Sequence, residues 1–206
     1  MSYKSGLLVL SGPSGAGKSS LINKVADKIG PYYFSISTTT RPMRDGEVDG
    51  VHYYFVSEEE FKKDIEAENF LEYALVHGNY YGTSMKPVKE ALKEDKLVIF
   101  DIDVQGHDEV KNRMGDLTTS VFVTTPSLKV LKERLNKRAT DEQEIINRRI
   151  EMAKREVQRI SEYDFLIIND DLDEAAEVLV SIAKAARMKI PSLEIHQFVH
   201  KWEAEG

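Results

Sequence analysis

A glycine-rich stretch near the start of the chain constrains its fold more than any other segment does. Between positions 12 and 19 the sequence matches the pattern G-x-x-x-x-G-K-[ST] in full. The apolar run Leu7–Ser11 predicts a buried strand before it, and a helix is predicted after it from about Lys18 to Ile29, which is the context that the pattern requires. Strand, loop and helix in this order predict an α/β domain with a parallel sheet. The loop and the next residue comprise Gly12, Pro13, Ser14, Gly15, Ala16, Gly17, Lys18, Ser19 and Ser20.

The residue types in this loop suit phosphate binding. Glycines let consecutive backbone N–H groups turn toward phosphate oxygens where a side chain would clash, and the following helix adds its positive N-terminal dipole. Lys18 can reach the β- and γ-phosphates of a nucleoside triphosphate, and the Ser19 hydroxyl can bind Mg²⁺. A chance match is expected in about one chain in a hundred of this length, so an ordinary glycine-rich turn is the weaker interpretation.

The composition excludes several other kinds of protein. The chain has 206 residues, which suffice for one domain, and it has no cysteine, which excludes disulfides, thiolate metal sites and cysteine nucleophiles. Its formal net charge of −7 argues against a nucleic-acid partner. No apolar stretch approaches the roughly 20 residues that a membrane span needs. We therefore expect a soluble, cytoplasmic protein that binds neither nucleic acid nor a membrane.

Short apolar runs alternate with amphipathic stretches along the rest of the chain, as in a sheet covered by helices. Ser57 and Glu60 form a capping box, which predicts the start of a short helix. We predict further strands at Tyr33–Ser37, His52–Val56, Phe70–Val76, Asn79–Tyr81, Leu97–Ile102, Val121–Thr125 and Phe165–Ile168. We predict further helices at Pro87–Glu94, Gln105–Arg113, Ser127–Arg138, Glu142–Ile160 and Leu172–Met188.

Two segments interrupt this alternation within a single domain, 1–206. The polar and aromatic segment 37–81 predicts a small mixed α/β insert, and the segment from about 129 to 159 carries ten Lys and Arg residues against six Asp and Glu. Such inserts on a phosphate-loop core carry a second substrate and a helical lid, although the basic segment could also be a solvated helix face. Residues 189–206 show no clear period and are expected to form a surface arm. The core then comprises 5–36, 82–128 and 160–188.

A second element typical of phosphate-loop proteins follows some 80 residues after the first. The predicted strand at 97–102 brings Asp101 to its carboxyl end, and either Asp101 or Asp103 could join the Mg²⁺ shell or orient an acceptor nucleotide. A GTPase would need an N-K-x-D segment, and the sequence contains none. A small chain with two inserts favours a nucleotide kinase, whose lid excludes water. His77 and His107 lack metal-ligand spacing and are expected on the surface.

The middle of the chain carries one long motif and several short ones. The long motif spans Ser37 to Tyr53 and reads STTTRPMRDGEVDGVHY. The short ones are Phe70–Tyr73, Gly78–Gly82, Asp101–Gly106 and Asn169–Asp173. Together with the phosphate loop and the basic segment that holds Arg138 and Arg149, this series resembles the guanylate kinase family. The resemblance covers about Ser5 to Lys184 in the expected order.

The resemblance implies a P-loop kinase fold and a set of site residues. It implies that ATP and GMP are the substrates, that Mg²⁺ arrives with ATP, and that Lys18, Arg138 and Arg149 neutralise charge on the transferring phosphates. Asp101 would serve the metal with Ser19, and Asp101 or Asp103 would lie close to the guanine. Asn169 would lie near the adenine. The GMP phosphate would be held by Ser37, Arg41, Arg44, Tyr53 and Tyr81, and the guanine would be read by Glu72 and Thr83.

Some alternatives stay open at this stage. Arg41 and Arg44 could be surface arginines paired with Glu47 or Asp49, and Glu72 could be a satisfied carboxylate at a sheet edge. The chain could act on another monophosphate, or it could be a peptide-binding scaffold of the same fold, although its intact phosphate loop argues against the scaffold. We expect supply of purine nucleotides as the role, and either a monomer or a homodimer as the assembly.

Overall fold

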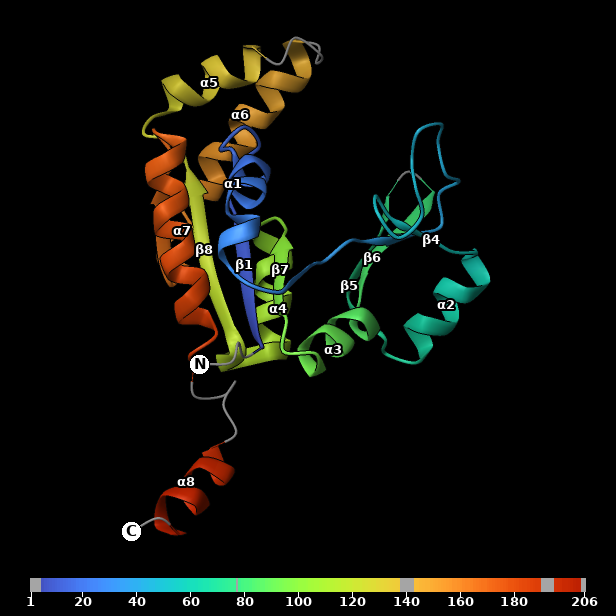
Figure 1. Cartoon of the computed structure of the whole chain (residues 1–206). Helices are drawn as coiled ribbons and strands as arrows, with labels where there is room; N and C mark the ends of the chain where they lie inside the picture. The colour runs from blue at the N-terminus through green and yellow to red at the C-terminus, as the bar shows by residue number, and fades with distance from the viewer. Residues whose placement is uncertain (1–4, 77, 138–142, 190–194, 205–206) are drawn as a thin grey trace.

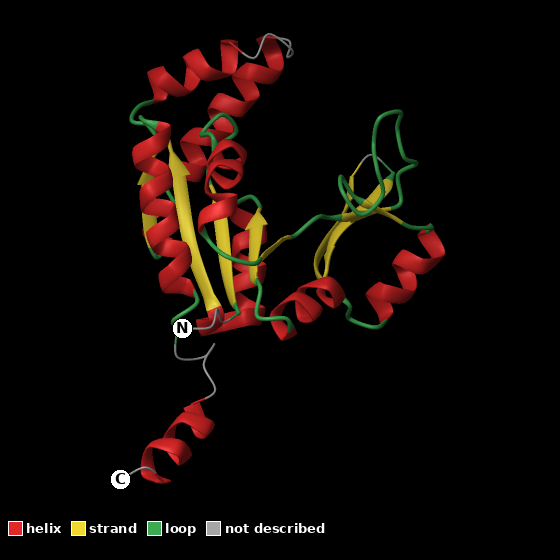
Figure 2. Ribbon diagram, in the orientation of Figure 1, coloured by secondary structure: helices red, strands yellow, loops and turns green. Residues whose placement is uncertain are grey.

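The centre of the computed structural model is a parallel sheet of five strands. The structure describes residues 5–76, 78–137, 143–189 and 195–204, and the strand order is β2-β7-β1-β8-β9. All four neighbouring pairs are parallel, as the sequence predicts. Figure 2 shows these strands as one group and a second group of strands to its side. The five strands are β1 (Gly6–Ser11), β2 (Tyr32–Phe34), β7 (Leu97–Asp101), β8 (Thr118–Thr124) and β9 (Phe165–Ile168).

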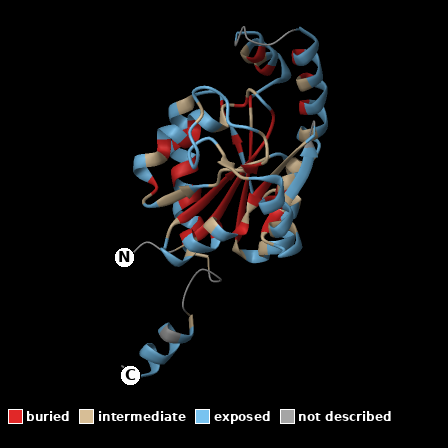
Figure 3. Cartoon of the chain, turned by 90° about the vertical axis from the view of Figure 1, so that its right-hand side faces the viewer, coloured by how far each residue is buried: buried red, intermediate tan, exposed pale blue. Residues whose placement is uncertain are grey.

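Helices cover both faces of this sheet because successive residues of each strand point to opposite faces. On β1, Leu8 and Leu10 pack with α1 (Lys18–Val25) and α7 (Leu172–Ala186). Leu7 and Val9, the alternate residues, pack with α3 (Met85–Lys93) and α4 (Val104–Met114). Strand β1 is buried along its whole length, and β7 and β8 are buried except at their last residues (Figure 3). Single 3₁₀ turns follow α1 and α4, at Ala26–Lys28 and Gly115–Leu117.

A second, mixed sheet lies to the side of the core (Figure 1) and has the order β4-β3-β6-β5. Helix α2 (Glu58–Glu66) packs on it through Phe61, whose ring stacks on Phe70 and Tyr80. The predicted capping box of Ser57 and Glu60 is present at the start of α2. The strands are β3 (Thr38–Thr39), β4 (Tyr54–Phe55), β5 (Phe70–Val76) and β6 (Asn79–Ser84).

Two helices above the carboxyl end of the core form a small cluster of their own (Figure 1). Helices α5 (Leu128–Lys137) and α6 (Gln143–Val157) contact each other through Leu131, Leu135 and Ile150. The connection from α6 to β9 contains a 3₁₀ turn, Ile160–Glu162. This helical pair occupies the segment where the sequence predicts a lid.

The connection after α6 is fixed on one face of α4. Arg159 donates to both carboxylate oxygens of Asp108, at 2.7 and 2.9 Å, and to the carbonyl oxygen of Val104 at 3.2 Å. The ring of His107 stacks on that of Tyr163, with centroids 4.1 Å apart, and is only 1% exposed. The expectation that His107 lies on the surface is therefore wrong, because α4 turns this position toward the α6–β9 connection. His77 lies outside the described residues.

The chain ends in an additional helix, α8 (Ile195–Ala204), which stands apart from the domain (Figure 1). Its apolar side chains Phe198 and Trp202 are 65% and 71% exposed. The sequence predicts an arm without a clear period here, so the helix is an addition to that prediction. Within the described ranges, no helix combines the length and the apolar character that crossing a membrane demands.

The other predicted elements are all present within the described residues; β5 and β9 have the predicted bounds, and the rest have shifted ends. Strand β2 ends at Phe34 instead of Ser37, and β4 has two residues instead of five. Strand β6 continues to Ser84, so it crosses the expected boundary between insert and core at 81 and 82. Short strands at the edge of a sheet are poorly defined by sequence, because their length depends on the neighbouring strand. The domain boundaries stay predictions.

Candidate active site

The glycine-rich loop lines a hollow of about 330 Å³ at the carboxyl end of β1. At two positions of the loop, other atoms approach the backbone so closely that only glycine fits. Gly12 has a φ of +132°, and a Cβ there would lie 2.0 Å from the Val123 carbonyl oxygen. Gly17 has a φ of +93°, and its Cβ would lie 2.3 Å from Nδ2 of Asn169. The lining residues are Gly12, Pro13, Ser14, Gly15, Gly17, Lys18, Ser19, Ser20, Asp101, Ile102, Asp103 and Glu156.

Lys18 and Ser19 both meet Asp101, which ends the neighbouring strand β7. The Lys18 ammonium donates to the Gly12 carbonyl oxygen at 2.7 Å and lies 3.5 Å from Oδ1 of Asp101. The Ser19 hydroxyl donates to Oδ2 of the same carboxylate at 3.4 Å. A hydroxyl and a carboxylate so close together offer the oxygen ligands that Mg²⁺ accepts, with water and phosphate oxygens to complete its shell. Asp101 rather than Asp103 stands beside Ser19.

Asn169 lies beneath the loop and contacts its backbone. Its side chain is 3% exposed, and Nδ2 donates to the Ala16 carbonyl oxygen at 2.7 Å. The Asn169 carbonyl oxygen in turn accepts a hydrogen bond of 2.8 Å from Arg134 of α5. The loop residue Ala16 is itself buried and does not line the hollow. Asn169 therefore holds the shape of the loop from below.

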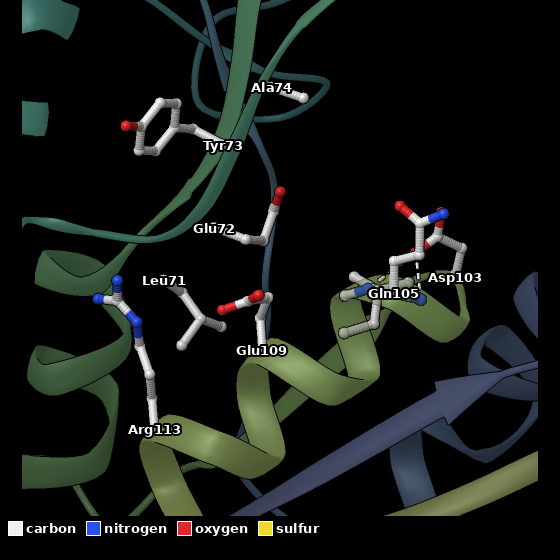
Figure 4. Close-up of a pocket in the computed structure, with 10 residues that line it drawn as sticks. Leu71, Glu72, Tyr73, Ala74, Asp103, Gln105, Glu109 and Arg113 are labelled. Atoms are coloured by element: carbon white, nitrogen blue, oxygen red, sulfur yellow. Dashed lines mark hydrogen bonds between the residues drawn. The ribbon is translucent and has the colours of Figure 1, made fainter.

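A second hollow, of about 510 Å³, lies between β5 and α4 (Figure 4). Glu72 points into it from β5, and Glu109 and Arg113 line it from α4. Oε1 of Glu72 accepts a hydrogen bond of 2.7 Å from the hydroxyl of Thr83, a residue that is 3% exposed. Burial raises the pKa of the Glu72 carboxyl, and the nearby charges of Asp103 and Glu109 add to this increase. The lining residues are Leu71, Glu72, Tyr73, Ala74, Ile102, Asp103, Gln105, Gly106, Glu109 and Arg113.

The two hollows share a wall made of Ile102 and Asp103. The Asp103 carboxylate caps α4, because Oδ1 accepts hydrogen bonds from the backbone N–H groups of Gln105 and Gly106 at 3.0 and 2.8 Å. The cap fixes this side chain at the start of the helix. Asp103 thus stands where a ligand in one hollow would face a ligand in the other.

Two of the predicted phosphate ligands of the insert, Tyr53 and Tyr81, lie close to Arg41. Its guanidinium lies 5.4 Å from the centroid of the Tyr53 ring, and the Tyr53 and Tyr81 rings are 6.1 Å apart. Arg41 also forms a two-pronged ion pair with Glu47, at 2.7 and 3.0 Å. The hydrogen bonds from Arg41 and from the Arg44 backbone lower the pKa of Glu47 to about 2. Pairing of Arg41 with Glu47, the alternative left open by the sequence, is therefore what the ligand-free chain adopts.

This group stands on the insert and not in the walls of either hollow. Among the described residues that line the two hollows, none of the five predicted phosphate ligands is present. Arg44 is exposed, and Ser37 lies just before β3 and is partly buried. Figure 1 shows the reason, because the second sheet projects away from the core. The predicted phosphate ligands are Ser37, Arg41, Arg44, Tyr53 and Tyr81.

Of the two arginines predicted for the lid, the structure describes one. Arg149 lies on α6 and is partly buried, whereas Arg138 lies outside the described residues.

Two residues that the sequence analysis does not single out also belong to the site. Glu156 of α6 lines the loop hollow, and burial raises the pKa of its carboxyl. Arg134 of α5 donates to the Asn169 carbonyl oxygen, and its position four residues before Arg138 in a basic stretch of sequence was the available signal.

A parallel sheet that carries a phosphate loop, with helices on both faces and a second, mixed sheet at its side, is the fold of a P-loop kinase. Comparison with known proteins narrows this class. The family model described as guanylate kinase matches residues 4–186, so the chain belongs to the guanylate kinase family.

Individual relatives agree with this assignment. A guanylate kinase of Sulfurimonas denitrificans is 70% identical over 204 residues, which cover 98% of this chain and 99% of that protein. A guanylate kinase of Helicobacter hepaticus is 50% identical and covers 97% of this chain and 99% of its own length. The crystal structure of guanylate kinase from Anaplasma phagocytophilum superposes with a TM-score of 0.71 at 29% identity, and covers 98% of this chain and 96% of that one. The chain is therefore an enzyme of this family.

Proposed function

We propose that the chain transfers the γ-phosphoryl group of ATP to GMP and forms ADP and GDP. One observation carries this proposal: the loop hollow and the Glu72 hollow meet at Ile102 and Asp103. Ligands in the two hollows would therefore be neighbours. Two reactants held side by side react as if in one molecule, which removes much of the entropic barrier to transfer.

On the donor side, the loop from Gly12 to Ser20 would hold the phosphates of ATP. Lys18 would move from Asp101 to the β- and γ-phosphates and would neutralise charge that develops on the transferring group. Asn169 would act here by supporting the loop, since its side chain is bound to Ala16. Its position beneath the loop would also set the floor of the nearby adenine site.

Mg²⁺ would enter with ATP and supply neutralisation of phosphate charge. Ser19 and Asp101 are the residues that would contribute oxygen ligands to it, since their oxygens are 3.4 Å apart. Asp103 is already committed to the cap of α4, and its place in the shared wall suits contact with GMP instead.

On the acceptor side, Glu72 and Thr83 would read the guanine. The base presents N1–H and the 2-amino group as adjacent donors, which a carboxylate accepts in matching geometry. Thr83 would donate its hydroxyl hydrogen to the guanine O6 and would exchange its present bond to Glu72 for that contact. Adenine has an acceptor at N1 and no amino group at C2, so it would leave Glu72 unpaired in a buried site.

The GMP phosphate would be held by Ser37, Arg41, Arg44, Tyr53 and Tyr81 once the insert approaches the core. Arg41 already donates to Glu47 and, through Nη1, to the Pro42 carbonyl oxygen at 2.7 Å, so its guanidinium is held in a fixed orientation on the insert. An acceptor phosphate oxygen is already anionic near neutral pH. We therefore assign no general base to the reaction.

The helical pair α5 and α6 would close over the donor phosphates. Arg138 and Arg149 would bring positive charge to the transferring phosphoryl group, and closure would exclude the water that could otherwise accept it. The basic balance of the segment 129–159 favours an open arrangement until polyanionic ligands bind. We further propose that the enzyme serves purine nucleotide supply in the cytoplasm, as a monomer or a homodimer.

A coupled assay for ADP release, run with GMP, AMP, CMP and UMP in turn, tests the proposal. We expect turnover with GMP to exceed turnover with AMP by ~10⁴-fold or more, because a site built on hydrogen bonds rejects a partner that leaves them unmade. Equal turnover with AMP and GMP would show that GMP is not the specific acceptor. GMP binding without ADP release would indicate a scaffold of the same fold.

A further inference from the structure

Strand β5 contains a bulge immediately before Glu72. In its antiparallel ladder with β6, Phe70 pairs with Ser84 and Glu72 pairs with Thr83, so that Leu71 is the extra residue on β5. A bulge of this kind puts two residues opposite one and changes which side chains share a face of the strand.

The bulge decides where the Glu72 side chain lies. In a regular strand residues two apart share a face, so Phe70 and Glu72 would point the same way. Instead, Phe70 shares its face with Tyr73, three residues on, and the centroids of their rings lie 4.1 and 6.5 Å from that of the Phe61 ring. Leu71 packs in the core, and both Leu71 and Glu72 line the second hollow, between β5 and α4. Without the bulge, Glu72 would enter the aromatic cluster around Phe61.

Arg113 of α4 holds the backbone at this bulge. Its Nη1 donates to the Phe70 carbonyl oxygen at 2.7 Å, across 43 positions of sequence. Figure 4 shows Arg113 and Glu109 rising from α4 toward the stretch of β5 that carries Leu71 and Glu72. The hydrogen bond joins a helix of the core to a strand of the second sheet at the residue where the strand changes face.

We propose that Arg113 is a positioning residue for base recognition, which fixes the β5 bulge and thereby the direction of the Glu72 carboxylate. The inference rests on the proposed function, because it assumes that Glu72 accepts hydrogen bonds from guanine. The flat guanidinium donates along a fixed direction, so it can orient a backbone carbonyl in a way that a flexible ammonium cannot. Arg113 would thus influence specificity through Glu72 and not by touching the base.

The test compares Arg113→Met with Arg113→Lys and with a control variant. Arg113→Met keeps an unbranched side chain but removes every hydrogen-bond donor of the guanidinium. Lys93→Met is a suitable control, because Lys93 is an exposed cation of α3 that lines neither hollow. Each protein is assayed with GMP and with IMP, which lacks the 2-amino group and so makes only the N1–H contact to Glu72. Thermal unfolding is followed in parallel.

We expect the ratio of kcat/KM for GMP to that for IMP to fall about tenfold in Arg113→Met, the scale of one well-placed hydrogen bond to a charged group. KM for ATP should stay within about twofold, Arg113→Lys should recover part of the ratio, and Lys93→Met should match the wild type. A residue that merely stabilised the fold would lower both activities together and leave the ratio unchanged.

A wild-type ratio in folded Arg113→Met overturns the inference while the proposed function stands. A wild-type enzyme without preference for GMP over IMP or AMP overturns both. If Arg113→Met does not fold, Arg113→Lys decides: a ratio lowered by about threefold or more supports the inference, because an ammonium lacks the directed geometry of the guanidinium, and an unchanged ratio contradicts it.

Discussion

Thr83 donates its hydroxyl hydrogen to the Glu72 carboxylate across 2.7 Å, and the two residues face each other on neighbouring strands. The pair joins the two residues that we assign to guanine recognition. Thr83 is almost fully buried, whereas Glu72 lines the second hollow, between β5 and α4. The carboxylate is therefore oriented before any ligand binds.

Glu72→Ala is expected to lose most of the activity with GMP, by ~10²-fold or more in kcat/KM, because the paired donors of guanine lose their acceptor. Thr83→Ala should lose less, because the carboxylate remains. Neither change should alter KM for ATP much. Thr83→Ser is the matched control, since it keeps the hydroxyl and should remain close to the wild type. Retention of full GMP preference by Glu72→Ala would remove the base-reading role.

The raised pKa of Glu72 predicts how GMP binding and stability depend on pH. Recognition needs the ionised carboxylate. As the pH is lowered, KM for GMP should therefore begin to rise at a higher pH than it would with a glutamate of ordinary pKa. A raised pKa in the folded state means that the stability contribution is present at low pH and is lost as pH rises through that pKa. Glu72→Gln should therefore increase the melting temperature of the ligand-free protein at pH 7.

Glu72→Gln also separates this effect from titration of the GMP phosphate, which has a pKa of about 6. Its KM for GMP should be raised throughout but should keep only the pH dependence due to the phosphate. The same pH dependence in both proteins, or a lower melting temperature for the variant, would contradict the assignment.

Lys18→Ala should lower kcat by at least ~10²-fold, the scale expected for one preorganised charge at a transition state. The melting temperature should change little, because the polar contacts of the Lys18 ammonium within the described part of the chain are with the Gly12 carbonyl oxygen and Asp101. Lys24→Ala, on the same helix and paired with Asp173, is the control and should keep normal turnover. Near-normal kcat in Lys18→Ala would defeat the assignment of the loop as the phosphate site.

Glu47→Gln should weaken the two-pronged pair that orients Arg41. We expect a rise of about tenfold in KM for GMP with little change in KM for ATP, because the arginine would have to be ordered on binding. The lowered pKa of Glu47 means that its stabilising contribution is present above pH 4.5 and is lost as pH falls toward about 2. Hydrogen exchange of 41–55 should accordingly be faster in the variant, and an unchanged rate and KM would show that the pair has no such role.

Deletion of residues 190–206 should leave kcat/KM for GMP within about threefold of the full chain, because α8 contributes no residue to either hollow. The exposed side chains Phe198 and Trp202 give α8 an apolar side that a contact with another surface would bury. Sedimentation and thermal unfolding of both proteins should therefore show a change in assembly or stability. Loss of GMP binding in a folded truncation would place the arm in the active site.

Local patterns predicted much of this protein. The phosphate loop, the predominantly parallel core and most helices depend on neighbours in sequence, such as the alternation along β1 and the capping box at Ser57. The motifs that resemble the guanylate kinase family are also short stretches of sequence, and the match of the family model confirms the family that they indicate. The sequence also proposed Glu72 and Thr83 as partners in one task, and the structure brings them together.

Only tertiary structure decided how these parts meet. Asn169 lies under Ala16, 153 positions away, and His107 is buried against Tyr163 because α4 packs on the connection after α6. Nothing in the local sequence marks Leu71 as the extra residue of a bulge, since that depends on its register with β6. Propensity and periodicity act over a few residues, whereas packing and hydrogen bonding between distant segments determine which face each residue finally occupies.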